Sequence, residues 1–358
     1  MDLGLVGRAN AGKTALFCLV TGAEAEIAPY PYTTREPARA MADVPDPRLD
    51  AIADAQDIPR RVPAQVQLVD IAGLAAGAGA GEGLGGAALG QLRQMDALIH
   101  VVRAFSNAEV PHPEDRVDPV ADAEAVDLEL VVADREQAGR RLERVRKGAR
   151  VGEPGAAAEL AGLELLVAEL DAGRPARLVE DEAARGLAAD MGLLTGKPVL
   201  YLANTDEELE PSPELAAYAA AQGAQALALP VGLELELAAM EPSEAAELAQ
   251  EMELGSVRGA DSVMAAAYRL LDLVTFFTGS GPPEARAWPI RRGTTAAAAA
   301  GKIHSDLARG FIRAETIPWD ALVAAGSWSK AKEKASLRME GRDYVVQEGD
   351  VLQVRFNV

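Results

Sequence analysis

The sequence contains little cysteine, few aromatic residues and no long uninterrupted apolar run. Its 358 residues include a single cysteine, Cys18, so no intramolecular disulfide can form. A lone cysteine is usual in the reducing cytoplasm, and no apolar run is long enough to cross a bilayer. We therefore expect a cytoplasmic protein with no secretory leader and no membrane partner.

Positive charge is also scarce, since 35 Lys and Arg face 55 Asp and Glu and the formal net charge is −20. This excess of negative charge argues against a protein whose whole surface binds nucleic acid. Hydrophobic residues make up 49% of the chain, which is typical of folded proteins. At this length the chain can hold two or three domains, each with its own core.

The most informative motif is GRANAGKT, from Gly7 to Thr14, which matches the phosphate-binding pattern G-x-x-x-x-G-K-[ST]. The apolar LGLV before it predicts a buried strand, and the segment after it predicts a helix whose positive dipole end faces the anion. Lys13 is expected to stabilise the β- and γ-phosphates as a catalytic group, and the Thr14 hydroxyl to bind Mg²⁺. The alternative is a glycine-rich turn that carries a chance lysine. The predicted nucleotide contacts of this loop are Asn10, Ala11, Gly12, Lys13, Thr14 and Ala15.

A second element, DIAGL, follows the strand-like run VQLVD. Asp70 at the carboxyl end of a parallel strand can reach Mg²⁺, and the Gly73 amide can meet a γ-phosphate. Thr34, in APYPYTTREP, lies at a distance typical of a first switch segment, where its hydroxyl would sense both Mg²⁺ and the γ-phosphate. Its alternative is an ordinary loop threonine. The predicted Mg²⁺ ligands are therefore Thr14, Thr34 and Asp70.

A third element, NTDE, follows the strand-like run VLYLA. G proteins of the Ras kind have N-K-x-D here, with an Asp carboxylate that accepts from two guanine N–H groups. In this chain Thr205 replaces the Lys and Glu207 replaces the Asp, so the longer side chain displaces the carboxylate from the guanine edge. A poorly paired polar group costs roughly 1 to 3 kcal/mol, so adenine should compete well. The predicted base contacts are Asn204, Thr205, Glu207, Val231 and Gly232, the last two in the base-closing segment ALPVGLELEL.

Along the chain, apolar runs at residues 66–71, 97–102 and 198–203 alternate with helical patterns. Short buried strands joined by helices form a largely parallel sheet, so the fold class is α/β. Between 128 and 195 two long amphipathic stretches predict an inserted helical hairpin. The tail alternates short strand candidates with turns and predicts a small α+β module.

These patterns divide the chain into four segments. We assign 1–127 and 196–275 to the nucleotide-binding domain, 128–195 to the helical insert and 276–358 to the tail. The tail from Glu284 to Val358 carries 12 Lys and Arg against 9 Asp and Glu, and the insert has a basic stretch between Arg135 and Arg150. These two basic elements could contact a polyanion, and the alternative is an ordinary solvated surface.

Taken together, the motifs resemble the YchF/Obg-like ATPase family over nearly the whole chain. The matching segments are GRANAGKT, YPYTTREP, VPDPRLD, VDIAGL with GEGLG, HVVRAF, RVDP, NTDE, FFTGSGPPEARAW, RRGTTAAAAAGKIHSDLARGFIRAE and GRDYVVQEGDVLQVRFNV. The resemblance implies a P-loop G domain interrupted by a coiled-coil-like helical domain, and a C-terminal TGS domain with a β-grasp-like fold. Members of the family prefer ATP over GTP and associate with ribosomes.

The resemblance also implies roles for individual residues. Leu74 stands where Ras-type proteins keep a water-orienting Gln, and a leucine cannot orient water. In the family a His in the loop after the HVVR strand is proposed for this step, and His112, within EVPHPEDRVDP, matches that position. The alternative is an exposed loop histidine. Asn10 matches the position that helps to hold a K⁺ ion in related proteins.

The sequence departs from the family at Arg8 and Ala9, which replace Leu and Pro, and in the segment that closes over the base. Arg8 could contact a phosphate or point outward. We predict an Mg²⁺-dependent hydrolase of ATP that switches conformation and engages the ribosome or rRNA through the TGS domain and the insert. Two alternatives keep the architecture: a GTP-specific hydrolase, and a nucleotide-gated binding module with negligible hydrolysis.

Overall fold

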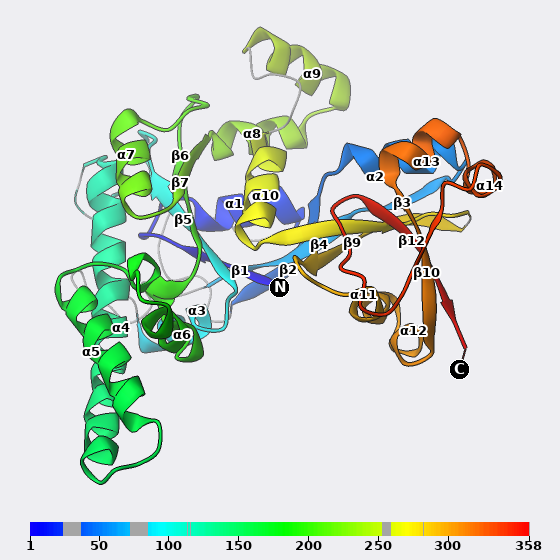
Figure 1. Cartoon of the computed structure of the whole chain (residues 1–358). Coiled ribbons are helices and arrows are strands. Elements are labelled where there is room, and N and C mark those ends of the chain that lie inside the picture. Colours follow the sequence, from blue (N-terminus) through cyan, green and yellow to red (C-terminus); the bar gives the residue numbers. More distant parts are fainter. Residues whose placement is uncertain are drawn as a thin grey trace. The chain divides into compact units, whose positions relative to one another are not determined.

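The computed structural model describes residues 1–23, 37–71, 85–112, 114, 116–252, 259–281 and 283–357 (Figure 1). The chain forms two compact units. The first contains Met1–Met41 and Gln67–Ala267, and the second contains Ala42–Val66 and Tyr268–Val358. The four-segment division made from the sequence stays a prediction.

The first unit is built on a six-stranded sheet with the order β2-β4-β1-β5-β6-β7. The strands are β1 (Asp2–Val6), β2 (Ala38–Val44), β4 (Ala64–Asp70), β5 (Ala97–Arg103), β6 (Val199–Asn204) and β7 (Gln225–Leu229). The neighbours from β4 to β7 pair in parallel. Every residue of β5 and β6 is buried, as expected for strands covered on both faces. The predicted α/β class is confirmed.

Helices cover this sheet and extend beyond it (Figure 1). They are α1 (Lys13–Thr21), α3 (Gly86–Leu92), α4 (Pro119–Arg150), α5 (Ala156–Asp171), α6 (Glu182–Asp190), α7 (Pro213–Ala221), α8 (Val231–Ala239), α9 (Pro242–Glu251) and α10 (Gly259–Leu270). Within the described ranges, no helix combines the length and the apolar character that a membrane span requires.

Helix α4 begins at Pro119, earlier than the amphipathic pattern suggests. The Asp118 carboxylate accepts from the Ala121 amide at 3.1 Å, and proline at the first helical position suits a helix start. The first turns of α4 pack on the sheet through Ala123 and Val126. From Val131 onward the helix packs instead against α5, so one helix serves two cores.

The hairpin of α4 and α5 pairs most of the basic stretch with carboxylates. Arg141 Nε lies 2.7 Å from Glu159 Oε1, and Arg135 Nε lies 2.6 Å from Asp171 Oδ1. Arg146 also approaches a carboxylate of α5. The sequence pattern showed only the acidic residues on the same helix, so it overstated the positive charge that the folded hairpin presents.

The second unit contains a mixed sheet with the order β11-β10-β12-β8-β9-β3. Its strands are β3 (Arg60–Val62), β8 (Leu273–Thr278), β9 (Glu284–Arg291), β10 (Phe311–Pro318), β11 (Arg338–Glu340) and β12 (Asp350–Phe356). Its helices are α2 (Pro47–Ala55), α11 (Ala296–Ile303), α12 (Ser305–Arg309), α13 (Trp319–Ala325) and α14 (Trp328–Glu333). Phe276, Ile290 and Leu352 lie at its core. The predicted α+β tail is confirmed, but α2 and β3 join it from a distant part of the chain.

Candidate nucleotide site

Three loops that the sequence singled out lie at the same edge of the parallel sheet. The P-loop follows β1, Asp70 ends β4, and Asn204 ends β6. The carboxyl ends of parallel strands share an edge, and ligands of such sheets bind there. The strands therefore bring together motifs that are far apart along the chain.

The P-loop follows a path that only particular residues allow. Gly12 has φ 99° and Asn10 has φ 60°, both in the left-handed region. A β-carbon on Gly7 would lie 2.2 Å from the carbonyl oxygen of Val101, and one on Gly12 would lie 2.2 Å from the amide nitrogen of Asn204. Both glycines of the motif are thus required by sterics, in addition to any contact with phosphate.

Lys13 points back over the loop that precedes it. Its Nζ donates to the carbonyl oxygens of Gly7 at 3.0 Å and Arg8 at 2.7 Å. Burial lowers the pKa of Lys13 to about 8, against the opposing effect of the Asp70 carboxylate. Helix α1 starts at Lys13, so the amides of its first turn, including that of Ala15, have no partner within the helix. A partly buried ammonium beside amides without helical partners favours an anion.

Oxygen ligands for a divalent cation meet next to Lys13. The Thr14 hydroxyl donates to Asp70 Oδ2 at 2.7 Å, and Asp70 is buried. A hydroxyl and a carboxylate are donors that Mg²⁺ accepts, so these two residues fit the predicted ion. Thr34 and Gly73, the remaining predicted contacts, lie outside the described residues.

Asn204 links the loops of the site. Its Nδ2 donates to the Ala11 carbonyl oxygen at 3.0 Å, and its Oδ1 accepts from the Val231 amide at 3.3 Å. Gly232 follows as the second residue of α8. The side chain therefore ties the P-loop to the start of α8, a structural role that the motif alone did not reveal. Its contact with the base stays a prediction.

The two substituted positions of the base loop differ in their surroundings. The Thr205 hydroxyl donates to the Glu208 carbonyl oxygen at 2.7 Å, and Thr205 is buried. Glu207 is exposed. Asp206, between them, accepts from the Ser106 amide at 3.0 Å and so joins the loops that follow β5 and β6. The Thr205 side chain is engaged within its own loop, whereas that of Glu207 faces solvent.

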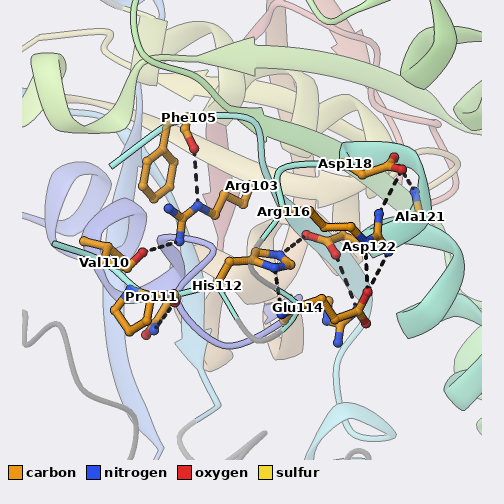
Figure 2. Close-up of polar contacts among 12 residues, drawn as sticks. Arg103, Phe105, Val110, Pro111, His112, Glu114, Arg116, Asp118, Ala121 and Asp122 are labelled. Atoms are coloured by element: carbon orange, nitrogen blue, oxygen red, sulfur yellow. Dashed lines mark hydrogen bonds and ion pairs between the residues drawn. The ribbon is translucent and has the colours of Figure 1, made fainter. Parts of the chain in front are cut away.

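His112 is buried, with 8% of its surface exposed, in contrast to the exposed loop histidine that the sequence left open. Its ring nitrogens contact Glu114 and Asp122 (Figure 2). Its Nδ1 accepts from the Glu114 amide at 3.1 Å. Nδ1 must then carry a lone pair, so the ring proton is on Nε2, which lies 2.8 Å from Asp122 Oδ2. The catalytic role of His112 stays a prediction.

Two P-loop side chains fasten the loop that carries His112. Asn10 Nδ2 donates to the Pro111 carbonyl oxygen at 2.9 Å. Arg8 Nη1 lies 2.7 Å from Glu114 Oε1 and 3.4 Å from Asp122 Oδ1. Hydrogen bonds from Arg8 and from a neighbouring arginine lower the pKa of Glu114. Arg8 therefore pairs with carboxylates of the same unit, which neither interpretation of the sequence anticipated.

Arg103, the last residue of β5, holds the same loop (Figure 2). It is buried and donates to the carbonyl oxygens of Phe105, Asn107 and Val110 at 2.9 to 3.2 Å. Sequence reasoning missed both Arg103 and Asp122. The signal for Asp122 was its place four residues before Val126, on the buried face of a helix.

At one edge of this sheet, the P-loop would contact the phosphates, the end of β4 would contact the cation and the loop after β6 would contact the base. P-loop proteins of the GTPase type bind nucleotides in this way. Two family models match the chain. One, described as "50S ribosome-binding GTPase", matches residues 2–139, and the other, YchF-GTPase_C, described as a protein of unknown function, matches residues 273–357.

Full-length relatives narrow this class. "Ribosome-binding ATPase YchF" of Bacillus subtilis is 41% identical, with 100% of both chains covered. "Obg-like ATPase 1" of Oryza sativa is 36% identical, covering 100% of this chain and 92% of that protein. The solved Schizosaccharomyces pombe YchF GTPase has a TM-score of 0.86 at 31% identity, covering 99% of this chain and 97% of the other. The chain belongs to the YchF/Obg-like ATPase family, as its motifs suggested.

Proposed function

We propose that this chain binds and hydrolyses ATP with Mg²⁺ and acts as a conformational switch on the ribosome, in the cytoplasm. The observation that carries the chemistry is the P-loop cluster, in which the partly buried Lys13 ammonium lies beside the paired Thr14 hydroxyl and Asp70 carboxylate. The names of the YchF relatives, which are ribosome-binding ATPases, support the substrate and the partner.

In the proposed reaction water attacks the γ-phosphorus, the bond from that phosphorus to the β,γ-bridging oxygen breaks, and ADP, inorganic phosphate and a proton are released. Lys13 and the amides from Asn10 to Ala15 hold the phosphates and stabilise the charge that develops on them. Thr14, Thr34 and Asp70 would hold the metal. A bound Mg²⁺ supplies positive charge to the β- and γ-phosphates. His112 orients the attacking water, since Leu74 offers no polar group for that step.

GTP is the second candidate substrate. The fission-yeast relative is named as a GTPase, and the family model that matches the N-terminal region describes one too. Against guanine stands Glu207, which is exposed and one methylene longer than the Asp that Ras-type proteins use. We propose that adenine binds better, and that Glu207→Asp shifts the ratio of affinities toward GTP by up to about tenfold.

K⁺ is a further proposed component. Asn10 uses its amide nitrogen to hold the Pro111 carbonyl, and its Oδ1 is an acceptor of the kind that binds cations. A monovalent cation there would add positive charge beside the phosphates. Exchange of K⁺ for Na⁺ should then slow hydrolysis, and an unchanged rate would remove this component.

Nucleotide titration together with hydrolysis assays tests the proposal. Lys13→Ala should abolish binding of ATP and GTP, because the ammonium that pairs with the phosphates is lost. His112→Ala should leave binding intact and slow single-turnover hydrolysis, with and without ribosomes. A chain that binds ATP but does not hydrolyse it under either condition would be a nucleotide-gated binding module instead.

A further inference from the structure

We infer that Asp122 is the positioning residue for His112, and that Nδ1 is the ring nitrogen that faces the attacking water. This inference rests on the proposed hydrolysis for its function, but its geometry can be tested separately. Asp122 Oδ2 lies 2.8 Å from His112 Nε2, on the opposite side of the ring from Nδ1. In this arrangement the carboxylate acts through the histidine.

Asp122 is held in place by the buried start of helix α4. It lies in the first turn of α4, where the Asp118 carbonyl accepts its amide at 3.0 Å, and only 2% of its surface is exposed. The helix is anchored on the sheet by Ala123 and Val126. A carboxylate at the buried start of an anchored helix can fix the orientation of an imidazole that lies on a loop.

Arg8 pairs with the other carboxylate oxygen of Asp122. Its guanidinium occupies the second oxygen, Oδ1, at 3.4 Å, while His112 occupies Oδ2. A buried carboxylate is costly unless it is paired, and Arg8 supplies the pairing charge. Because Arg8 belongs to the P-loop, the position of Asp122 is tied to the loop that is proposed to hold the phosphates.

The tautomer follows from these contacts. With its proton on Nε2 and directed at Asp122, His112 keeps a lone pair on Nδ1, which accepts from the Glu114 amide. Orienting water then requires only that a water O–H replace this amide N–H, while the contact with Asp122 stays in place. The carboxylate also stabilises positive charge on the ring if Nδ1 accepts a proton.

Asp122→Asn is the decisive substitution because it keeps the size of the side chain. Arg8 can only donate, so it selects the amide oxygen and turns the NH₂ group toward His112 Nε2. The ring proton must then move to Nδ1, which removes the acceptor for water. Single-turnover ATP hydrolysis should fall by about 100-fold, while the Kd for ATP stays within about twofold.

Asp118→Asn is the matched control, since it removes an exposed carboxylate one turn earlier on α4 and asparagine also caps helices. It should leave hydrolysis unchanged. A second test places Asp122→Asn on a His112→Ala background, where no further loss is expected because Asp122 acts only through the ring. Losses that multiply, or an Asp122→Asn chain with the full rate, would overturn the inference.

A spectroscopic measurement separates this inference from the proposed activity. Nitrogen-15 spectra of the three histidines, with His112 assigned by its loss in His112→Gln, report which ring nitrogen carries the proton. The unaltered chain should show Nε2–H at His112 and Asp122→Asn should show Nδ1–H. Absence of ATPase activity would contradict the proposed function alone, whereas an Nδ1–H signal in the unaltered chain would contradict the positioning by Asp122.

Discussion

Steric contact with Asn204 restricts which residue can occupy position 12 of the phosphate-binding loop. At Gly12 a β-carbon would collide with the Asn204 amide, and that amide cannot move freely because it bridges Ala11 and Val231. The glycine and the asparagine therefore constrain each other across the site. A motif that is usually explained by its contact with phosphate is here also explained by its contact with the neighbouring loop.

Gly12→Ala should weaken ATP binding at least about tenfold and cost about 1 to 3 kcal/mol of stability, because φ 99° and the contact with Asn204 both disfavour alanine. Titration calorimetry and thermal unfolding measure the two effects. Gly186→Ala is the control, since Gly186 lies inside α6 with open space around its Cα. It should raise stability by up to about 1 kcal/mol and leave binding unchanged.

Contacts between elements hold the nucleotide-binding unit together. Asp127 on α4 accepts hydrogen bonds from Tyr201 on β6 and from Tyr218 on α7, the latter at 2.7 Å, and lies 3.5 Å from His100 on β5. Burial alone would raise the pKa of Asp127, but these three neighbours outweigh it and hold the pKa below its usual value. The carboxylate thus joins one helix to two strands and a second helix.

The sign of the pH effect follows from this shift. A carboxyl whose folded pKa is depressed stabilises the fold above its unfolded pKa, near 3.9, and loses that contribution as the pH falls through the folded pKa. Asp127→Asn should therefore lower the free energy of unfolding by about 1 to 2 kcal/mol at neutral pH. The difference should shrink in urea titrations as the pH falls below about 4 and the Asp127 carboxylate is protonated. Glu136→Gln, exposed on the same helix, should show no such convergence.

The helical hairpin offers a contrast between two adjacent leucines. Leu166 is fully buried between α4 and α5, whereas Leu165 is 50% exposed. Leu166→Ala should destabilise the unit by about 3 kcal/mol through the cavity that it leaves, and Leu165→Ala by less than about 0.5 kcal/mol. Both should bind ATP normally, since the site lies at the sheet edge. If chemical unfolding showed that both variants are destabilised equally, Leu166 would not be the core residue of the hairpin.

At the scale of the whole molecule, charge bears on the proposed ribosome partner. The chain has a net charge of −20, and three arginines of α4 pair with carboxylates of α5. Exposed cations on the same helix, Arg144 and Lys147, are the better candidates for contact with a polyanion. The positive surface of the insert is therefore narrower than its composition indicates.

Replacing Arg144 and Lys147 by Glu should weaken co-sedimentation with ribosomes by about tenfold at low salt, with a smaller effect as salt rises. Arg140→Glu is the control, because the charge of Arg140 is already matched by Glu136. Unchanged co-sedimentation of the double variant would exclude this face of the insert as a ribosome contact and direct attention to the C-terminal unit.

Local patterns in the sequence were sufficient for much of the fold. The apolar runs predicted β4, β5 and β6 to within two residues at each end, and the P-loop spacing predicted the turn between β1 and α1. Such patterns work because burial and turn geometry act on neighbouring residues. The sequence did not assign strand β3 and helix α2 to the C-terminal unit, since nothing local links them to it. Strand β3 has only three residues, and two of them are exposed.

By itself, then, the sequence determined the central strands β1, β4, β5 and β6, the phosphate-binding loop and the family of this protein. The tertiary structure alone decided that Asn204 ties two loops, that Arg8 and His112 share the carboxylate of Asp122, and that α5 neutralises arginines of α4. The physical reason is that these are hydrogen bonds and ion pairs between side chains on different elements. Their existence depends on distances and orientations that only the packed chain defines.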